Sequence, residues 1–396
     1  MKAKFYLMAF MLMSCIGAFA QWTKPVITGT TLAAGEECYL YNVEADAFFL
    51  GANDWLTRAS VSELRGYKVW LEAHESDPSS YYITNYIEDG DHAGETLCVY
   101  IADWDAVWID QAKDGDNDKL FTFEDQSNGT YKIGLSALNP TFNPTAWIDA
   151  YLGLIPAKED TRLYICDAES EFDVATFQTT WKIVSPTEYA SYIPAKKTYN
   201  AAVKLGNAIT KAKTENDGID ISEVEAVYAN IASTEDELTA AYTRLEELVM
   251  AFQTASVSPE KPADYTPLII NPSYDDNNKD GWNGTAPGFQ TFGNAEYYWA
   301  TYDINQTLTG LKNGVYRVGV TAFYRAGWAD WDAEAYTKFL DGDNSSQHAK
   351  LYANTTAVAG LTANLPLMSS GASETSLTTD ELQNTHGYVP NAMKSA

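Results

Sequence analysis

A short motif occurs three times in the first half of the chain. It consists of a tryptophan, an aliphatic residue and then Glu or Asp. Its copies are centred on Trp70, Trp108 and Trp147, which lie 38 and 39 residues apart. Such regular spacing indicates repeated supersecondary units that bury a face only against one another. We therefore expect three similar units within residues 21–185, each of about four strands.

The sequence around these motifs is typical of β-strands. Short runs such as CYLYNV, SYYITNY, LCVYIA and TYKIGL alternate or are rich in β-branched and aromatic residues, and Gly, Asn, Asp and Pro separate them. About a dozen such runs are present by this criterion. Three four-stranded units that close on one another make a β-trefoil-like domain, which we predict for residues 21–185.

Two phrases in this segment resemble a known class of module. The stretch LYNVEADAFFLGANDWLTRAS near its start and WKIVSPTEY at its end resemble trefoil-like modules of exported Bacteroidota proteins. Leu56 departs from that pattern, because glycine is usual at this position. The resemblance implies an exported, multimodular protein.

From Ser185 to Ser256 the apolar period changes from two to about 3.6, which predicts three short antiparallel helices over residues 186–256. STEDE, residues 233–237, is typical of a capped helix start. The segment YNAAVKLGNAITKAK and the later YANIASTEDELTAAYTRL resemble FIVAR-like helical modules. The resemblance implies a spacer between binding domains, without a ligand of its own.

Beyond a Pro- and Ser-containing linker, the chain again has a strand pattern. LIINPSYDDNNKDGW and DINQTLTGLKNGVYRVGVTAFYRAG resemble galactose-binding-type jelly rolls of the carbohydrate-binding-module kind. We predict a partial β-sandwich over residues 257–396, with a central strand from Val315 to Tyr324 whose alternation puts Val318 and Val320 on one face. The late closing strand of such jelly rolls is missing, so we expect the domain to be truncated at its C-terminus. The chain as a whole is predicted to be multidomain and mainly β.

The first twenty residues have the features of a secretory signal peptide. Lys2 and Lys4 precede an apolar run, and Ala18-Phe19-Ala20 suits signal peptidase. A loose lipoprotein box ends at Cys15, so a lipid anchor there is the alternative. No later apolar run reaches the roughly 20 residues that a transmembrane helix needs. We predict a secreted, extracellular or cell-surface protein.

Composition restricts the partners. The chain has 54 acidic and 26 basic residues, a net charge of −28, which repels nucleic acids and anionic membranes. Its 13% aromatic residues provide flat apolar faces for sugar rings. Beyond the signal peptide Cys38, Cys98 and Cys166 cannot all pair, and none has metal-ligand spacing. We expect buried thiols, with a single disulfide as the alternative.

The repeated motif also suggests a binding site. In a strand, residues two apart share a face, so each tryptophan lies beside its acid while the aliphatic neighbours face the core. An indole next to a carboxylate gives a sugar both a stacking surface and an acceptor for hydroxyl groups. The alternative is that the tryptophans only seal gaps between strands. The candidate pairs are Trp70 with Glu72, Trp108 with Asp110, and Trp147 with Asp149.

A second group of candidates lies in FYRAGWADWDAEAY, residues 323–336, at the end of the predicted central strand and just after it. Loops presented by a rigid sheet commonly carry binding residues, and large aromatic side chains are costly to expose without a use. We expect this loop to contribute more glycan affinity than the trefoil tryptophans; local packing is the alternative. Its candidate residues are Tyr324, Trp328, Trp331 and Tyr336.

One acidic turn could hold a cation. Asp114, Asp116 and Asp118 are spaced like the oxygen ligands of calcium loops. Lys119, however, occupies the sixth position, where a calcium loop needs glycine, and this favours a solvated turn. A structural calcium ion at this turn, or at residues 275–280, is the only cofactor that the sequence suggests.

The four histidines are scattered, and the sequence lacks the motifs HExxH, GxSxG, GxxxxGK[ST] and CxxC. A carboxylate pair for glycoside hydrolysis is defined by separation in space, so the sequence leaves it open. We predict a non-catalytic carbohydrate-binding protein that captures polysaccharide. The alternatives are the accessory N-terminal portion of a glycoside hydrolase and a protein-binding adhesin with cell-surface partners.

Overall fold

The computed structural model describes most of the chain between residues 22 and 367. Two compact units, 1–306 and 307–396, are distinguished. In residues 110–111, 158, 174, 288–289, 295–296 and 330–333 only the backbone is described. The described residues are 22–50, 58–87, 94–101, 107–111, 119–139, 150–158, 161–166, 174–274, 278–289, 295–297, 301–320, 322, 324, 330–346, 348–355, 360–365 and 367.

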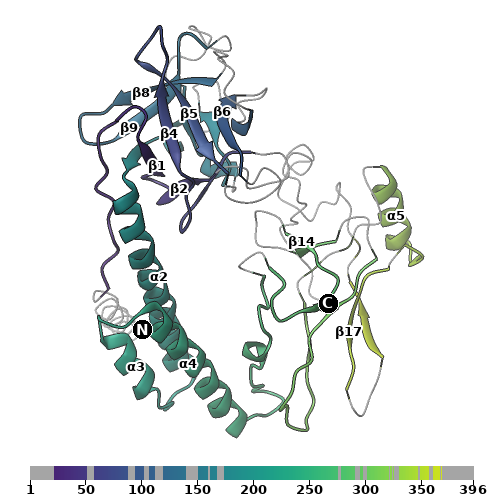
Figure 1. Ribbon diagram of the computed structural model, residues 1–396. Coiled ribbons are helices and arrows are strands. Elements are labelled where there is room, and N and C mark those ends of the chain that lie inside the picture. The colour runs from purple at the N-terminus through teal and green to yellow at the C-terminus, as the bar shows by residue number, and fades with distance from the viewer. Residues whose placement is uncertain are drawn as a thin grey trace, which may run out of the picture. The chain divides into compact units, whose positions relative to one another are not determined.

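Six antiparallel strands of the first unit close into a barrel, and Figure 1 labels most of them. They are β1 (Glu37–Asn42), β4 (Val69–Ala73), β5 (Ser80–Tyr86), β8 (Leu120–Asp125), β9 (Tyr131–Leu135) and β12 (Trp181–Val184). Each pairs with the next in this order, and β12 pairs with β1. Closure satisfies both sides of every barrel strand, so the barrel itself has no free edge.

Three hairpins extend from the barrel. They are β2 (Ala47–Leu50) with β3 (Ser60–Ser62), β6 (Thr96–Ile101) with β7 (Val107–Gln111), and β10 (Tyr151–Gly153) with β11 (Tyr164–Cys166). Their backbones meet in a cyclic set of hydrogen bonds: the N–H of Ala59 donates to the carbonyl of Val107 (2.9 Å), Val107 to Leu163 (3.4 Å), and Leu163 to Ala59 (2.9 Å). This ring marks a pseudo-threefold axis. Twelve strands in three units of four confirm the predicted β-trefoil-like domain.

The trefoil core is formed by the aliphatic face of each strand. Leu40, Ile83 and Ile133, in matching positions of β1, β5 and β9, are fully buried. Trp181 is also fully buried, and its indole N–H donates to the carbonyl of Leu152 at 2.8 Å. Cys38, Cys98 and Cys166 are buried thiols, as expected, and no disulfide joins them. Burial raises the pKa of the Cys38 thiol to about 12, so this thiol is unreactive at neutral pH.

The tryptophan motif is not the repeat of the fold. Trp70 lies on the barrel strand β4 opposite Thr84, whereas Trp108 lies on the hairpin strand β7 opposite Tyr100. The register instead equates Trp70 with Thr122 and Lys182. The expected equivalence of Trp70 and Trp108 is therefore wrong, although the number of units is right. Successive side chains of every strand point to opposite faces, so a core-facing aliphatic residue next to an outward tryptophan can occur on strands of different kinds.

Three helices follow the trefoil: α2 (Pro186–Glu215), α3 (Ser222–Ala229) and α4 (Glu235–Ala255). The hydroxyl of Ser185 caps α2 by accepting from the N–H of Glu188 at 3.2 Å. Thr234 and Glu237 form the predicted capping box of α4. The first helix has 30 residues and is not short. Its extra length has a structural reason, because its N-terminal half packs against the trefoil.

Aromatic stacking attaches α2 to the outer face of β12 and β1. Tyr189 stacks flat on Tyr39, with ring centroids 3.7 Å apart and planes at 5°. Tyr192 meets Tyr41 and Phe48 edge-on, at centroid distances of 6.0 and 5.7 Å. Val184, Tyr39 and Tyr41 are buried in this cluster. The helix thus covers one of the three pseudo-equivalent faces of the barrel.

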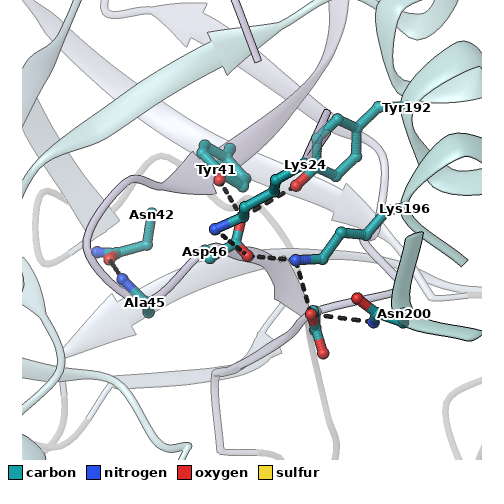
Figure 2. A network of polar contacts seen from close by, with 9 residues as sticks. Lys24, Tyr41, Asn42, Ala45, Asp46, Tyr192, Lys196 and Asn200 are labelled. Carbon is teal, nitrogen blue, oxygen red and sulfur yellow. Dashed lines mark hydrogen bonds and ion pairs between the residues drawn. The ribbon is translucent and has the colours of Figure 1, made fainter. Parts of the chain in front are cut away.

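A polar network around Asp46 fixes this attachment (Figure 2). The Asp46 carboxylate accepts hydrogen bonds from the hydroxyls of Tyr41 (2.5 Å) and Tyr192 (3.0 Å), and it pairs with the ammonium of Lys24 at 2.7 Å. Lys196 of α2 also donates to Asp46, and its side chain is only 2% exposed. One half-buried carboxylate therefore connects the N-terminal segment, the β1–β2 turn and α2.

These contacts shift the titration of both partners. Burial alone would raise the pKa of the Asp46 carboxyl, but the hydrogen bonds from Lys196, Lys24 and the two tyrosines together lower it to about 2. Burial would lower the pKa of Lys196, but its hydrogen bonds to Asp46 and Glu63 raise it. Glu63 lies 2.7 Å from the Lys196 ammonium. The pair is therefore ionised at neutral pH.

Beyond the helices the described strands are short. Residues of the first unit form β13 (Asn283–Gly284) with β16 (Ile304–Asn305) and β14 (Gly288–Phe289) with β15 (Ala295–Glu296). The second unit contains α5 (Asp330–Leu340) and the pair β17 (Lys350–Ala353) with β18 (Leu361–Asn364). Short 3-10 turns occur at Pro156–Lys158, Val174–Thr176 and Thr266–Leu268.

The central strand expected from Val315 to Tyr324 is not formed in the described residues. Residues 315–320 belong to no strand, and Val318 is 55% exposed. Tyr324 makes a single parallel bridge to Leu367. The alternation is real, but a strand also needs a neighbour to complete its hydrogen bonds, and the described residues supply none along 315–320. The predicted sandwich is not seen in this part of the chain.

We predict that Asp46→Asn lowers the free energy of unfolding by about 2 kcal/mol at pH 7, because it leaves the buried Lys196 ammonium without its main partner. Lys213→Met, which removes an exposed ion pair with Glu225, is the matched control and should have little effect. Urea unfolding of both variants and the wild type measures the difference. Equal effects of the two substitutions would contradict the structural role of Asp46.

The same network sets an acid limit. A folded pKa of about 2 lies below the roughly 3.9 of an unfolded aspartate, so the stabilisation is complete above about pH 4 and is lost as pH falls through about 2. Asp46→Asn should therefore flatten this part of the stability profile. Unfolding midpoints between pH 5 and pH 2 test this, and an unchanged acid slope in the variant would contradict it.

Candidate functional site

The outer face of β4 and β5 carries one of the predicted pairs. Val69 and Leu71 of β4 are fully buried in the core, whereas Trp70 and Glu72 lie on the opposite face and are half-buried. This confirms the expected alternation. Trp70 lies opposite Thr84 of β5.

Neighbouring strands surround the indole with hydrogen-bonding groups. On the other side of Trp70, β1 places the half-buried Glu37 directly opposite it. The hydroxyl of Thr84, a buried residue, donates to Oε1 of Glu72 at 3.2 Å and orients this carboxylate. The result is a half-exposed aromatic ring on a rigid barrel wall, with two carboxylates and a hydroxyl beside it. We call Glu37, Trp70, Glu72 and Thr84 the Trp70 face.

Glu37 and Thr84 were not identified from the sequence. They join the face only through the pairing of β1, β4 and β5. Glu37 lies 33 positions before Trp70 and has no motif in common with it. The alternation in the sequence identified only Trp70 and Glu72, which lie on the same strand, β4.

Trp108 has a different environment. The guanidinium of Arg58 lies over its ring, 5.1 Å from the centroid, and also over the ring of Tyr164 at 5.1 Å. Arg58 donates to the carbonyl of Leu163 at 3.3 Å, next to the axial ring of backbone bonds. The indole N–H of Trp108 is buried and has no hydrogen-bond partner among the described residues. One face of this indole is therefore occupied by a cation, which indicates a packing role.

Several predicted site residues cannot be placed. Asp110 lies on β7, but its side chain is not described. Those outside the described residues altogether are Trp147, Asp149, Trp328 and the proposed calcium ligands Asp114, Asp116 and Asp118. The roles suggested for them stay predictions. Within the described residues no group of three His, Cys, Asp or Glu side chains is arranged to hold a metal ion.

The predicted loop of the second unit is partly a helix. Trp331 and Tyr336 lie on α5, so the expectation that both belong to a loop is wrong. Alanines and an i,i+4 pair, Glu334 with Lys338 at 2.7 Å, favour the helix. Tyr336 is half-buried and stacks with Phe339 at 6.4 Å. Tyr324 is half-buried against His348, with ring centroids 6.2 Å apart, and burial raises its pKa.

None of the described helices is long and apolar enough to cross a membrane. No protein-family model and no curated protein matches this sequence.

Solved structures resemble parts of the chain at low identity. The lysenin pore is 12% identical over 41% of this chain and 50% of its own length, with a TM-score of 0.28. The designed three-fold symmetric protein ThreeFoil is 10% identical over 38% of this chain and 98% of its own, with a TM-score of 0.26. The BEL β-trefoil is 12% identical over 40% and 99%, with a TM-score of 0.28. This chain thus spans about half of the lysenin pore, and the trefoil assignment rests on the strand pairing described above.

We predict that Trp108→Ala lowers the free energy of unfolding by about 2–3 kcal/mol, because it removes a packed indole and one of the two rings that hold Arg58. Trp70→Ala should cost less than half as much, since Trp70 is half-buried and is not part of the hydrophobic core that the described residues of the trefoil form. Thermal and urea unfolding measure both variants. A larger loss for Trp70→Ala would identify Trp70 as the structural residue of the two.

Proposed function

We propose that this protein is a secreted or cell-surface, non-catalytic carbohydrate-binding protein that captures polysaccharide through the Trp70 face. The observation that supports this most is the indole of Trp70 on a rigid strand, with Glu37 and Glu72 beside it. A pyranose ring stacks its C–H face on an indole while its hydroxyls need acceptors around the ring. Carboxylates are strong acceptors for such hydroxyl groups.

The charge of the chain favours a neutral glycan. Two carboxylates lie at the Trp70 face, and the ammonium of Lys68 pairs with one of them, Glu37, at 3.5 Å. An anionic ligand would be repelled both locally and by the net charge of −28. Neutral hydroxyl groups, in contrast, would donate to Glu37 and Glu72 without a charge penalty. We therefore expect neutral hexose or pentose polymers, not acidic ones.

Two other functions stay open as alternatives. The chain could serve as the accessory portion of a glycoside hydrolase, or as an adhesin that binds a protein at the cell surface. Release of reducing sugar from soluble polysaccharides by the purified chain would support the first. Retention of a protein partner together with failure on a glycan array would support the second.

We predict that Trp70→Ala weakens binding of a retained polysaccharide roughly 5- to 30-fold, as expected for the loss of one stacking platform worth about 1–2 kcal/mol. Glu72→Gln should weaken it less, because an amide oxygen still accepts hydrogen bonds. Affinity electrophoresis in gels containing xyloglucan, galactan, mannan, arabinoxylan or laminarin gives the dissociation constants. Thermal melting of each variant shows whether the fold is kept.

Tyr316→Ala is the matched control, because Tyr316 is an exposed aromatic residue of the second unit that no candidate site includes. Its substitution should leave retardation unchanged. Trp328→Ala and Trp331→Ala test the sequence-based expectation that the second unit contributes more. If those two variants lose binding while Trp70→Ala keeps it, the site lies in the second unit and the Trp70 face is not the binding surface.

A further inference from the structure

The pseudo-threefold axis gives the Trp70 face two structural equivalents. The register that sets Trp70 and Glu72 against Thr84 and Tyr82 sets Thr122 and Glu124 of β8 against Gly134 and Lys132 of β9. It sets Lys182 and Val184 of β12 against Tyr41 and Tyr39 of β1. The third face is covered by α2. The second face, on β8 and β9, therefore deserves comparison with the first, because the acid at position 72 recurs there as Glu124.

The second face obtains its aromatic ring from a different strand. Thr122 is smaller than Trp70, and Gly134, which pairs with it, has no side chain. The outer surface of the sheet therefore carries little side-chain bulk at this point. Tyr151 of β10 pairs with Gly134, and its Cδ1 atom lies 3.6 Å from where a β-carbon on Gly134 would stand. A ring thus lies across the glycine, beside the position that the indole occupies on the first face.

Polar groups hold this ring in place. The hydroxyl of Tyr151 donates to Oε2 of Glu124 at 2.8 Å, and the Lys132 ammonium lies 4.4 Å from the ring centroid. Glu124 is exposed, and Lys132 and Tyr151 are half-buried. Among the described residues, nothing donates to Oε1 of Glu124 and no carboxylate pairs with Lys132. The face therefore offers an oriented ring, a free acceptor and a set of free N–H donors.

We propose that Glu124, Lys132 and Tyr151 form a second carbohydrate-binding site, which takes a neutral pyranose residue of the same polysaccharide. The sugar stacks on Tyr151, donates a hydroxyl to Glu124 and accepts from Lys132, whose flexible chain moves aside from the ring. The opposite charges of Glu124 and Lys132 cancel, which suits a neutral ligand. This inference rests on the proposed function and adds a second binding point to it.

The third face supports the idea that these surfaces accept planar rings. Tyr39 occupies the position equivalent to Lys132 and Tyr82, and the ring of Tyr189 from α2 stacks on it at 3.7 Å and 5°. One equivalent face thus already binds a ring from outside the barrel. The first two faces are neighbours, because β5 pairs with β8. A polysaccharide chain that is bound at one face would meet the other face at a high effective concentration. Contact with both faces would therefore increase its affinity.

A purely structural role of Tyr151 is the competing explanation, since an aromatic residue often covers a cross-strand glycine. The decisive variant is therefore Glu124→Gln combined with Lys132→Met, which keeps the ring over Gly134. Tyr151→Ala, checked by thermal melting, is the second variant. Lys213→Met is the control for loss of an exposed lysine.

Isothermal titration with a tetrasaccharide prepared from the polysaccharide that the wild type retains counts the sites. We expect two sites per chain in the wild type and in Lys213→Met, one in the Glu124→Gln/Lys132→Met variant, one in Trp70→Ala, and none when Trp70→Ala and Tyr151→Ala are combined. Affinity for the intact polysaccharide should fall roughly 5- to 30-fold in the double variant at Glu124 and Lys132.

The outcomes separate this inference from the proposed function. Two sites in the Glu124→Gln/Lys132→Met variant, or a single site in the wild type that Trp70→Ala removes, overturns the second site and leaves the Trp70 face intact. A single site that Trp70→Ala spares and the Glu124 and Lys132 substitutions remove overturns the Trp70 face instead. Failure of the wild type to bind any of the five polysaccharides overturns both.

Discussion

The cyclic hydrogen bonds among Ala59, Val107 and Leu163 are the constraint on which the trefoil depends. They join three hairpins that have no long pairing with one another, and they do so with buried backbone groups that would otherwise lack partners. The six-stranded barrel then closes without an edge. Because this scaffold uses backbone bonds and an aliphatic core, the outward side chains of the three units are free to differ without loss of the fold.

The three outer faces show how far they differ. Over β12 and β1 the tyrosines of β1 are buried under α2. Over β4 and β5 the indole of Trp70 lies beside Glu72 and beside Glu37 of β1. Over β8 and β9 the ring comes from Tyr151 of the neighbouring hairpin. Function in such a fold belongs to the side chains and not to the architecture. Trp70 and Trp108 show that even the same residue type can have different roles in this fold. Both indoles are half-buried, but Arg58 already lies over one of them.

Alternation and spacing were enough to predict the strands, the number of units, the core positions Val69 and Leu71, the buried thiols and the capping box of α4. They could not supply the register between strands, which alone brings Glu37 and Thr84 to Trp70 and makes Thr122 its equivalent. Nor could alternation form a strand at 315–320, since a ladder needs a partner. The length of α2 was also missed, because the trefoil, and not helix propensity, accounts for its first three turns.

The Asp46 network determines how many faces remain for a ligand. Helix α2 competes with any external ring for the face of Tyr39 and Tyr41, and its advantage is that Lys196 is buried against Asp46 on the same surface. An aspartate with a pKa of about 2 stays ionised through the whole physiological range, so this competition does not weaken with pH. The attachment of the helix thus converts a threefold scaffold into one with two accessible faces. These two faces share a barrel wall through β5 and β8, which is the arrangement that an extended polymer can contact along its length.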